Sequence, residues 1–322
     1  MKILSYSLSV CLLLACASRA ESTIDKYPEY FLGKNGWVIS KIDYTDIVRL
    51  RDVKSSWPQS HFDLAAKVVK SLESKGIKVV MAIVPQRLNV YPQILPDELY
   101  KDFTATTSSY SNLLPEIISR DIKTVDLLKI IKNAKSYAST PAAYYRLEPH
   151  WSFNGASAAA KAIADLTKSS FPDLKLPVKK YILKILPATP RKDIYWLNNF
   201  PKDVQATVPM DMEVPYTITA PPASSSALLG EAVPAVTIVG TSFTGYGFKQ
   251  ALLVDLSTDI LDASLPGKGM WTPMTQYINS PAFIKNPPKL IVWEMPEYIL
   301  SNYPLPNDDE YKILKDRLGV VK

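Results

Sequence analysis

The sequence predicts an α/β domain with a largely parallel sheet. Three apolar runs, at 77–84 (IKVVMAIV), 235–240 (AVTIVG) and 289–293 (KLIVW), are continuous rather than alternating, which is typical of strands buried on both faces. Segments between these runs carry apolar residues at the spacing of an amphipathic helix. Strands that alternate with helices favour a parallel sheet joined by crossover helices.

The expected elements follow one another along the chain. A turn at 33–36 (GKNG) precedes a first strand at 37–40 (WVIS), and a helix at 61–75, stopped by Gly76, leads into the strand at 77–84, which Pro85 ends. The next expected elements are a helix at 111–120, a short strand at 123–127, a helix to about residue 138, a strand at 144–147 and a helix at 155–169.

Residues 172–234 are rich in proline and aromatic residues and interrupt this alternation. Strand signals resume after them, so we interpret the stretch as a long excursion from one domain rather than as a domain boundary. A short helix is expected from Asp308, with no carbohydrate-binding module appended to it. Residues 21–322 are therefore predicted to form a single domain.

Composition excludes several kinds of chemistry. Of the 322 residues, 47% are hydrophobic, which is enough for a large core. The formal net charge of +6 is too small and too evenly spread to indicate nucleic-acid binding. Both cysteines, Cys11 and Cys16, lie near the N-terminus, and the chain has two histidines. No disulfide, thiol nucleophile, metal site or cofactor is therefore expected in the mature domain.

Residues 1–20 are predicted to be a signal peptide. Lys2 supplies the positive start, and the apolar region that follows is too short to span a bilayer comfortably. One reading places cleavage after the small-x-small site at 18–20, so that the mature chain starts at Glu21. The other reads 13–16 (LLAC) as a lipobox, with Cys16 lipidated and the chain tethered to a membrane.

A candidate nucleophile follows the strand at 235–240. Ser242, in IVGTSFT, comes after a strand and a glycine, where a hydroxyl and backbone N–H groups can face the same space. The alternative is an ordinary turn or helix-capping serine.

A candidate base and its acidic partner lie in YYRLEPH. Glu148 and His150 are two residues apart, and Pro149 favours an extended backbone between them, so both side chains project to one side. The carboxylate can then orient the imidazole, which can take a proton from Ser242. The alternative is a histidine packed beside Trp151 with a solvated Glu148. His61 is interpreted as a surface residue that opens a helix, which leaves His150 as the only plausible base.

Two further carboxylates, Glu294 and Glu297, occur in LIVWEMPE at another strand end. Either side chain can face the same cleft, where Glu294 is a candidate for a substrate contact or for the acidic member in place of Glu148. A surface carboxylate is the alternative.

Six blocks in order resemble the bacterial alginate O-acetyltransferase family. YYRLEPHWSFNGA is similar to that family's Asp-x-His-Trp…Gly block. The other similar blocks are LGKNGWVI, VMAIVPQRLNVYPQILP, TVDLL, IVGTSFT and LIVWEMPEYIL. Three positions depart from the family pattern: Glu148 stands for the usual aspartate, Arg87 for a lysine and Tyr298 for an arginine.

The resemblance implies a three-layer α/β/α SGNH-hydrolase-like fold and a periplasmic enzyme. Ser242 matches the serine that carries the acetyl group, His150 the base and Glu148 the acid. The acceptor would be a hydroxyl of an exopolysaccharide such as alginate. A membrane-bound acyltransferase would supply the acetyl group, and other polysaccharide export proteins would be partners. Arg87, Tyr91, Arg146, Trp151 and Tyr246 are candidates for sugar contacts.

Three functions remain open at this point. The chain can be an O-acetyltransferase, an acetyl esterase that uses water as the acceptor, or a catalytically silent polysaccharide-binding scaffold of an export complex. The glutamate at 148 motivates the last alternative, because its extra methylene can displace the imidazole.

Overall fold

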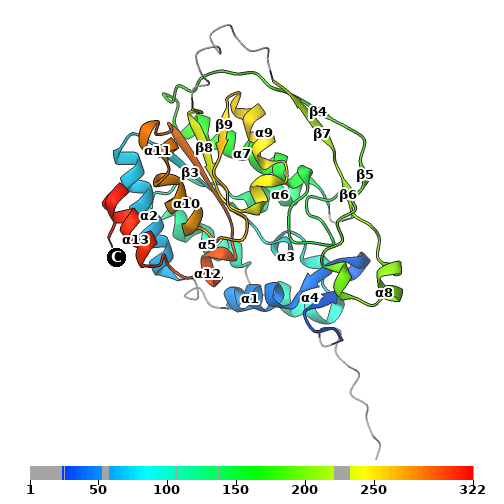
Figure 1. Ribbon diagram of the computed structural model, residues 1–322. Coiled ribbons are helices and arrows are strands. Elements are labelled where there is room, and N and C mark those ends of the chain that lie inside the picture. Colours follow the sequence, from blue (N-terminus) through cyan, green and yellow to red (C-terminus); the bar gives the residue numbers. More distant parts are fainter. Residues whose placement is uncertain are drawn as a thin grey trace, which may run out of the picture.

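A four-stranded sheet lies at the centre of the protein (Figure 1), and the computed structural model describes residue 24 and residues 26–52, 58–105, 108–136, 138–220 and 233–321. The strand order is β3 (Lys78–Val84), β10 (Leu290–Pro296), β8 (Val236–Val239) and β9 (Ile260–Asp262). All three pairings are parallel. The carboxyl ends of these strands therefore meet along one edge, where ligand sites of open α/β sheets form.

The three predicted buried strands are confirmed as β3, β8 and β10. Every residue of β8 and β10 is buried, as continuous apolar runs require. β10 runs to Pro296, beyond the predicted end at residue 293, and so carries Glu294 into the interior. The position of β10 between β3 and β8 could not be read from the order along the chain.

Helices pack on both sides of this sheet (Figure 1). On one side, α2 (Gln59–Ser74) contacts β3, and α10 (Trp271–Ile278) contacts β8, with α13 (Asp308–Leu318) against both helices. On the other side, α7 (Phe153–Ser170) contacts β3, α6 (Leu127–Ala134) and α9 (Phe248–Leu256). One large apolar core joins the strands to both sets of helices.

The described part of the chain has further helices and 3₁₀ turns. The remaining helices are α1 (Lys41–Asp52), α3 (Arg87–Val90), α4 (Asp97–Thr104), α5 (Ser109–Ile118), α8 (Lys202–Thr207), α11 (Pro281–Lys285) and α12 (Ile299–Asn302). Single 3₁₀ turns are η1 (Lys34–Gly36), η2 (Pro92–Ile94), η3 (Leu197–Asn199) and η5 (Ser242–Gly245).

The excursion at 172–234 forms two short antiparallel ribbons in its described residues. β4 (Ile182–Ile185) pairs with β7 (Tyr216–Thr219), and β5 (Thr189–Pro190) pairs with β6 (Met212–Glu213). Figure 1 shows both ribbons running along one flank of the molecule, outside the central sheet. We call the described residues of this segment, between α7 and β8, the strap. The strap returns to the edge of the central sheet, where it meets the loop at 144–151.

Two predicted strands are wrong or much reduced. Residues 144–147 form a bend rather than a strand, closed by one antiparallel bridge between Tyr144 and Trp151. Residues 123–127 keep a single parallel bridge, between Thr124 and Met81. The strand at 37–40 exists as β2 (Val38–Ser40), but it pairs antiparallel with β1 (Tyr30–Leu32), apart from the central sheet.

The surface position predicted for His61 is also wrong. Its side chain is 5% exposed, and its ring stacks on Trp271 of α10. Burial lowers the pKa of this imidazole below its ordinary value. His61 is therefore a core residue of α2.

The predicted signal peptide, with both cleavage sites and Cys16, lies outside the described residues. Among the helices that the structure does describe, none is both long enough and apolar enough to cross a bilayer.

Candidate functional site

Ser242 opens the 3₁₀ turn η5, three residues after β8 ends. The loop that carries it is held from the neighbouring strand by Glu294. This carboxylate accepts hydrogen bonds from the backbone N–H of Thr241 (2.7 Å) and from the hydroxyls of Thr241 (3.1 Å) and Thr244 (3.0 Å). Complete burial raises the pKa of Glu294 to about 7. Glu294 therefore fixes the position of the loop that carries Ser242.

Gly240 permits this close approach. A Cβ at residue 240 would lie 2.5 Å from Oε2 of Glu294, 2.9 Å from its Cβ and 2.9 Å from Oγ1 of Thr244. We expect Gly240→Ala to destabilise the fold by about 1–3 kcal/mol, as overpacking typically does. Thermal unfolding followed by circular dichroism measures this. Gly245→Ala is the matched control because a Cβ there meets nothing within 4 Å. An equal melting temperature for both variants would contradict the packing argument.

Glu148 and His150 lie on the bend between Tyr144 and Trp151. The bend is closed by hydrogen bonds from the backbone N–H of Tyr145 to the carbonyl of His150 (3.1 Å) and from that of Ser152 to the carbonyl of Ala143 (2.9 Å). The indole N–H of Trp151 donates to the carbonyl of Phe243 at 2.9 Å. This last bond ties the histidine bend directly to the serine loop.

Two buried charged side chains fix the backbone of the bend. Asp211, from the strap, accepts hydrogen bonds from the backbone N–H groups of Arg146 and Leu147, each at 2.9 Å. The guanidinium of Arg87 donates to the carbonyls of Tyr145, Arg146 and Glu148 at 3.0–3.2 Å. Leu147 itself is buried in a second, smaller apolar cluster with Trp196 and Phe200. Asp211, Arg87 and the apolar cluster around Leu147 thus hold the bend in place.

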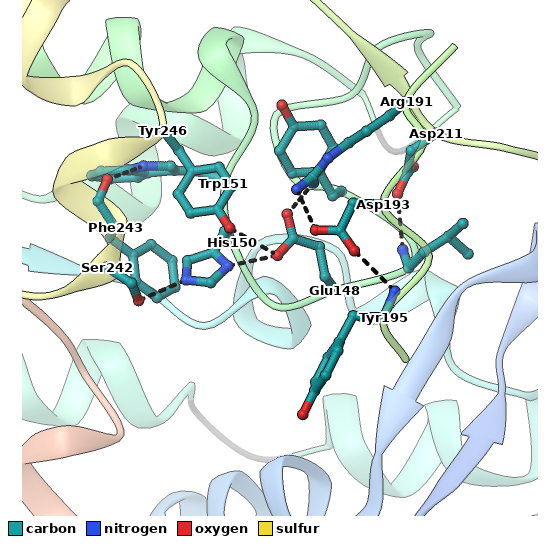
Figure 2. A network of polar contacts seen from close by, with 12 residues as sticks. Glu148, His150, Trp151, Arg191, Asp193, Tyr195, Asp211, Ser242, Phe243 and Tyr246 are labelled. Atoms are coloured by element: carbon teal, nitrogen blue, oxygen red, sulfur yellow. Dashed lines mark hydrogen bonds and ion pairs between the residues drawn. The ribbon is translucent and has the colours of Figure 1, made fainter. Parts of the chain in front are cut away.

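Ser242, His150 and Glu148 form a hydrogen-bonded line (Figure 2). Nε2 of His150 lies 2.7 Å from the hydroxyl oxygen of Ser242, and Nδ1 lies 2.6 Å from Oε2 of Glu148. With the ring proton on Nδ1, the imidazole donates to the carboxylate and its Nε2 accepts from the serine hydroxyl. The glutamate reaches the imidazole despite its extra methylene, so the displacement that motivated a silent scaffold is absent from this geometry.

Aromatic rings hold the imidazole in place. The ring of Tyr246 stacks on His150 with centroids 4.1 Å apart and planes 16° apart, and Phe243 lies 4.6 Å away at a tilt. The hydroxyl of Tyr246 donates to Oε2 of Glu148 at 3.4 Å. Burial raises the pKa of Tyr246 to about 12, so this hydroxyl keeps its proton near neutral pH.

Arg191 lies on the far side of the carboxylate from His150 (Figure 2). One of its nitrogens bonds Oε1 of Glu148, and the other bonds Asp193 at 3.0 Å. Burial alone would raise the pKa of Glu148. The hydrogen bonds and charges of His150 and Arg191 outweigh burial, so this pKa lies below its ordinary value. The carboxylate is therefore ionised at neutral pH.

Most residues predicted to contact sugar are interior. The side chains of Tyr91, Trp151 and Glu294 are at most 1% exposed, so they offer no surface to a polymer, and these predictions are wrong. Tyr91 instead donates to the carbonyl of Lys135 and accepts from the N–H of Ala143. Arg87 is also buried, because its guanidinium serves the bend at 144–151. Glu297 is fully buried as well, with hydrogen bonds from Ser109 and Asn89.

Arg146 and Tyr246 are the predicted contact residues that keep partial exposure. Tyr246 lies at the site, stacked on His150. Arg146 lies beside Asp211, with its Nε 3.9 Å from that carboxylate.

Sequence reasoning missed Arg191 and Asp211. Arg191 directly follows β5 and Asp211 directly precedes β6, and the backbone N–H of Arg191 donates to the carbonyl of Asp211 at 2.8 Å. No local pattern marks them. The one available signal is that the chain returns charged residues to the sheet edge after a long proline-rich detour.

Comparisons with known proteins agree with this architecture. The family model described as "SGNH hydrolase-like domain, acetyltransferase AlgX" matches residues 31–297. The chain is 26% identical over 298 residues to the "Probable alginate O-acetylase AlgJ" of Pseudomonas aeruginosa, covering 85% of this chain and 71% of that one. It is 25% identical over 286 residues to the "Alginate biosynthesis protein AlgX" of Azotobacter vinelandii, covering 84% of this chain and 55% of that one.

A solved structure shares the fold. The O-acetyltransferase domain of Pseudomonas putida AlgJ superposes with a TM-score of 0.66 at 23% identity, covering 90% of this chain and all of that one. The match of the family model to most of the chain, on the same α/β sheet with the serine at its carboxyl edge, decides the assignment. The chain belongs to the AlgX family of SGNH hydrolase-like acetyltransferase domains.

Proposed function

We propose that this protein is a periplasmic O-acetyltransferase that carries an acetyl group on Ser242 and passes it to a hydroxyl of an exopolysaccharide such as alginate. The observation that supports this most directly is the hydrogen-bonded line from Ser242 through His150 to Glu148. A serine, a base within hydrogen-bond reach and a third group that orients the base are what acyl transfer through a covalent intermediate needs.

In the first half-reaction, Nε2 of His150 takes the proton of Ser242 as the serine oxygen attacks the donor's acetyl carbon. The proton then passes to the leaving group. Glu148 remains ionised, holds the ring proton on Nδ1 and stabilises the imidazolium that forms. Arg191 and Tyr246 keep this carboxylate aligned from its other side.

In the second half-reaction, an acceptor hydroxyl takes the place of the leaving group. His150 removes its proton as the oxygen attacks the acetyl-serine, and then returns a proton to Ser242. An esterase would run the same step with water. The difference between the two activities lies in how well the site admits the sugar and excludes water.

The relatives' names support alginate as the acceptor and alginate biosynthesis as the setting. The net charge of +6 favours an anionic polymer such as a polyuronate. The family resemblance supports a membrane-bound acyltransferase as the acetyl donor and export proteins as partners, and the apolar N-terminal segment supports export to the periplasm. The presence of helices on both sides of the sheet supports a three-layer α/β/α arrangement.

The test begins with a chromogenic acetyl ester. The purified protein should release the chromophore, and mass spectrometry should find one acetyl group on the peptide that contains Ser242. Absence of both turnover and adduct would refute the enzymatic proposal.

The acceptor is identified by adding oligosaccharides to the same reaction. Acetylated polyuronate oligosaccharide indicates the transferase, and acetylated neutral oligosaccharide indicates a different acceptor. Free acetate alone, with every oligosaccharide, indicates an esterase. Repeating the assay at two salt concentrations separates charge attraction from shape, because salt screens the former.

The ion pair between Arg191 and Glu148 gives a prediction on pH. Because the pKa of Glu148 is held below its ordinary value, its ionised form stabilises the fold above the unfolded pKa, and this stability is lost as pH falls through the folded pKa. Arg191→Met removes one of the two groups that lower this pKa, and His150 remains. We expect unfolding to set in at a higher pH, and the acidic limb of the kcat/KM profile to move the same way.

At neutral pH the same variant should also lose stability, by up to about 3–5 kcal/mol, the cost typical of breaking a buried ion pair. Denaturant unfolding and ester turnover across acidic to neutral pH measure both effects. Asp193→Asn is the control, because Asp193 is half-exposed, bonds the other nitrogen of Arg191 and the backbone N–H of Tyr195, and is not hydrogen-bonded to Glu148 in the described structure. An unchanged pH profile in Arg191→Met would show that His150 alone holds the pKa of Glu148 below its ordinary value.

A further inference from the structure

A small cavity lies beside the chain neighbours of the serine and the histidine. Pro149, which precedes His150, and Phe243, which follows Ser242, both line it. Most of the remaining wall is apolar as well, from Ile39, Leu88 and Pro296. The cavity is therefore lined by residues from both chain segments that carry the site, and its largely apolar wall suits a small apolar group.

The topology of the sheet places this cavity above the end of β10. Pro296 is the last residue of β10 and pairs with Val84, the last residue of β3. Gln86 follows β3, and Ser242 follows β8, so the two residues flank the end of β10 from opposite sides. Two strand spacings, about 9.6 Å in all, separate β3 from β8, so the Gln86 side chain and an acetyl group on Ser242 can meet where both extend over the end of β10.

Gln86 places a side-chain N–H donor without a partner at the wall of the cavity. The residue is 9% exposed, and its backbone N–H donates to Oε2 of Glu297 at 3.0 Å, which fixes its position. Its side-chain nitrogen is buried and has no hydrogen-bond partner within the described part of the chain. Buried polar groups in native proteins are nearly always paired, so an unpaired amide that lines a cavity indicates a ligand with an acceptor atom.

The other polar groups of the cavity narrow the class of ligand. Arg87 is occupied by the backbone carbonyls of the bend, so it offers no free charge for an anion. Asp43 also lines the wall; burial raises the pKa of its carboxyl to about 6, so it is mostly ionised at neutral pH and disfavours a ligand with a permanent negative charge. An uncharged group with one acceptor oxygen and a small apolar part fits best, and an acetyl group has both.

We propose that this cavity is the acyl pocket, in which Gln86 donates its side-chain N–H to the carbonyl oxygen of the acetyl group on Ser242 while the methyl group lies against the apolar wall near Leu88. This inference rests on the proposed function. In the step concerned, the serine oxygen bonds the acetyl carbon, the bond to the leaving oxygen breaks, and the serine proton travels through His150 to that oxygen. The carbonyl oxygen becomes negative in between, when the Gln86 donor contributes most.

The first arm of the test removes the donor. Gln86→Leu should slow acetylation of Ser242 by a chromogenic acetyl ester about 10²–10³-fold, the usual effect of losing one donor to a developing oxyanion. Gln86→Glu keeps the shape but replaces the donor by an oxygen, and it should be at least as slow. The control Gln276→Glu makes the same change on an exposed face of α10 and should acetylate at the wild-type rate.

The second arm changes the size of the pocket. Leu88→Ala should raise the butyryl-to-acetyl ratio of kcat/KM about tenfold or more, because one methylene in an apolar pocket is worth about 10–200-fold in discrimination. The matched control is Leu72→Ala, which removes an equally buried side chain from α2. Thermal melts check that both variants fold. If Leu88→Ala does not fold, Ile39→Val widens the opposite wall and carries the same expectation at smaller magnitude.

The outcomes separate the two proposals. If the wild type never acquires an acetyl group on Ser242, the proposed function and the acyl pocket are both wrong. If Ser242 is acetylated but Gln86→Leu keeps the wild-type rate and Leu88→Ala keeps the wild-type acyl preference, only the acyl pocket is wrong. A rise in the KM for oligosaccharide alone would make the cavity an acceptor subsite, and an unchanged enzyme would leave it a water site; both overturn the inference.

Discussion

Replacing Ser242 by alanine should lower ester turnover about a millionfold, and His150→Ala should do the same. In a serine hydrolase of another fold, loss of the serine or of the histidine alone costs about as much as loss of the whole triad, roughly 2 × 10⁶ in kcat. The same non-additivity is expected here because the 2.7 Å hydrogen bond makes the two residues a single functional unit. The double variant should therefore be no slower than either single variant.

Single-turnover kinetics and intact-protein mass measure this prediction. Ser242→Ala must show no acetyl adduct, whereas His150→Ala retains the hydroxyl and should acquire the adduct only over very long times. Ser157→Ala, a serine replacement on the partly buried face of α7, is the control and should keep wild-type turnover. Independent, additive losses in the double variant would mean that the two residues act in different steps.

The pairing of Glu148 with His150 was predicted from the sequence, but for an incomplete reason. The prediction relied on an extended strand at 144–147, in which residues two apart share a side. The structure has a bend instead, and the two side chains meet because Arg87 and Asp211 hold the backbone that carries them. Aromatic and β-branched residues favour strands. In YYRL, however, Tyr144 is buried against Tyr91, its hydroxyl donates to the carbonyl of Pro85, and its backbone makes one isolated bridge rather than a strand.

The buried strands were predictable because a strand covered on both faces needs a continuous apolar run, and few other elements do. Their order was not, because the position of β10 between β3 and β8 depends on pairings between residues 212 positions apart (Leu290 with Lys78) and 54 positions apart (Leu290 with Val236). The same limit applies to Arg191. It reaches Glu148 across 43 residues, through a strap whose short ribbons leave no periodic pattern in the sequence.

Hydrogen bonds inside the protein explain why charged residues predicted to contact sugar are buried. Glu294 was assigned to the cleft because it lies at a strand end, and Arg87 was named as a candidate for sugar contact. Each has instead several backbone or hydroxyl partners that the sequence does not reveal. Both belong to the support of the site: Arg87 fixes the bend that carries His150, and Glu294 fixes the loop that carries Ser242.

The second large effect is expected from Glu148→Gln, which should lower turnover about ten-thousandfold. In a serine protease triad, the corresponding aspartate-to-asparagine change costs roughly that much because the imidazole adopts the wrong tautomer. An amide can turn its NH₂ group toward Nδ1 of His150. The ring proton then moves to Nε2, which can no longer accept the proton of Ser242.

Arg191 makes this effect stronger here. With Glu148 replaced by glutamine, the guanidinium loses its carboxylate partner and retains Asp193. The amide then presents its oxygen to Arg191, which leaves the NH₂ group as the part that faces Nδ1. The cation thus selects the unproductive orientation of the glutamine.

Glu148→Asp separates charge from reach. Aspartate restores the residue that the family usually has, but it is one methylene shorter in a pocket where glutamate already meets His150 at 2.6 Å and also contacts Arg191. We expect turnover between that of the wild type and that of Glu148→Gln. The control Glu213→Gln alters an exposed carboxylate on β6 and should leave turnover unchanged.

The measurement is kcat and KM for a chromogenic acetyl ester, with thermal melts for each variant. A positioning role for Glu148 predicts a fall in kcat with little change in KM, because the carboxylate orients the base and does not contact the ester. Near wild-type turnover in Glu148→Gln, while Ser242→Ala and His150→Ala are inactive, would show that the histidine needs no charged partner. The line of three residues would then be a pair, and Glu148 would serve the fold through Arg191 alone.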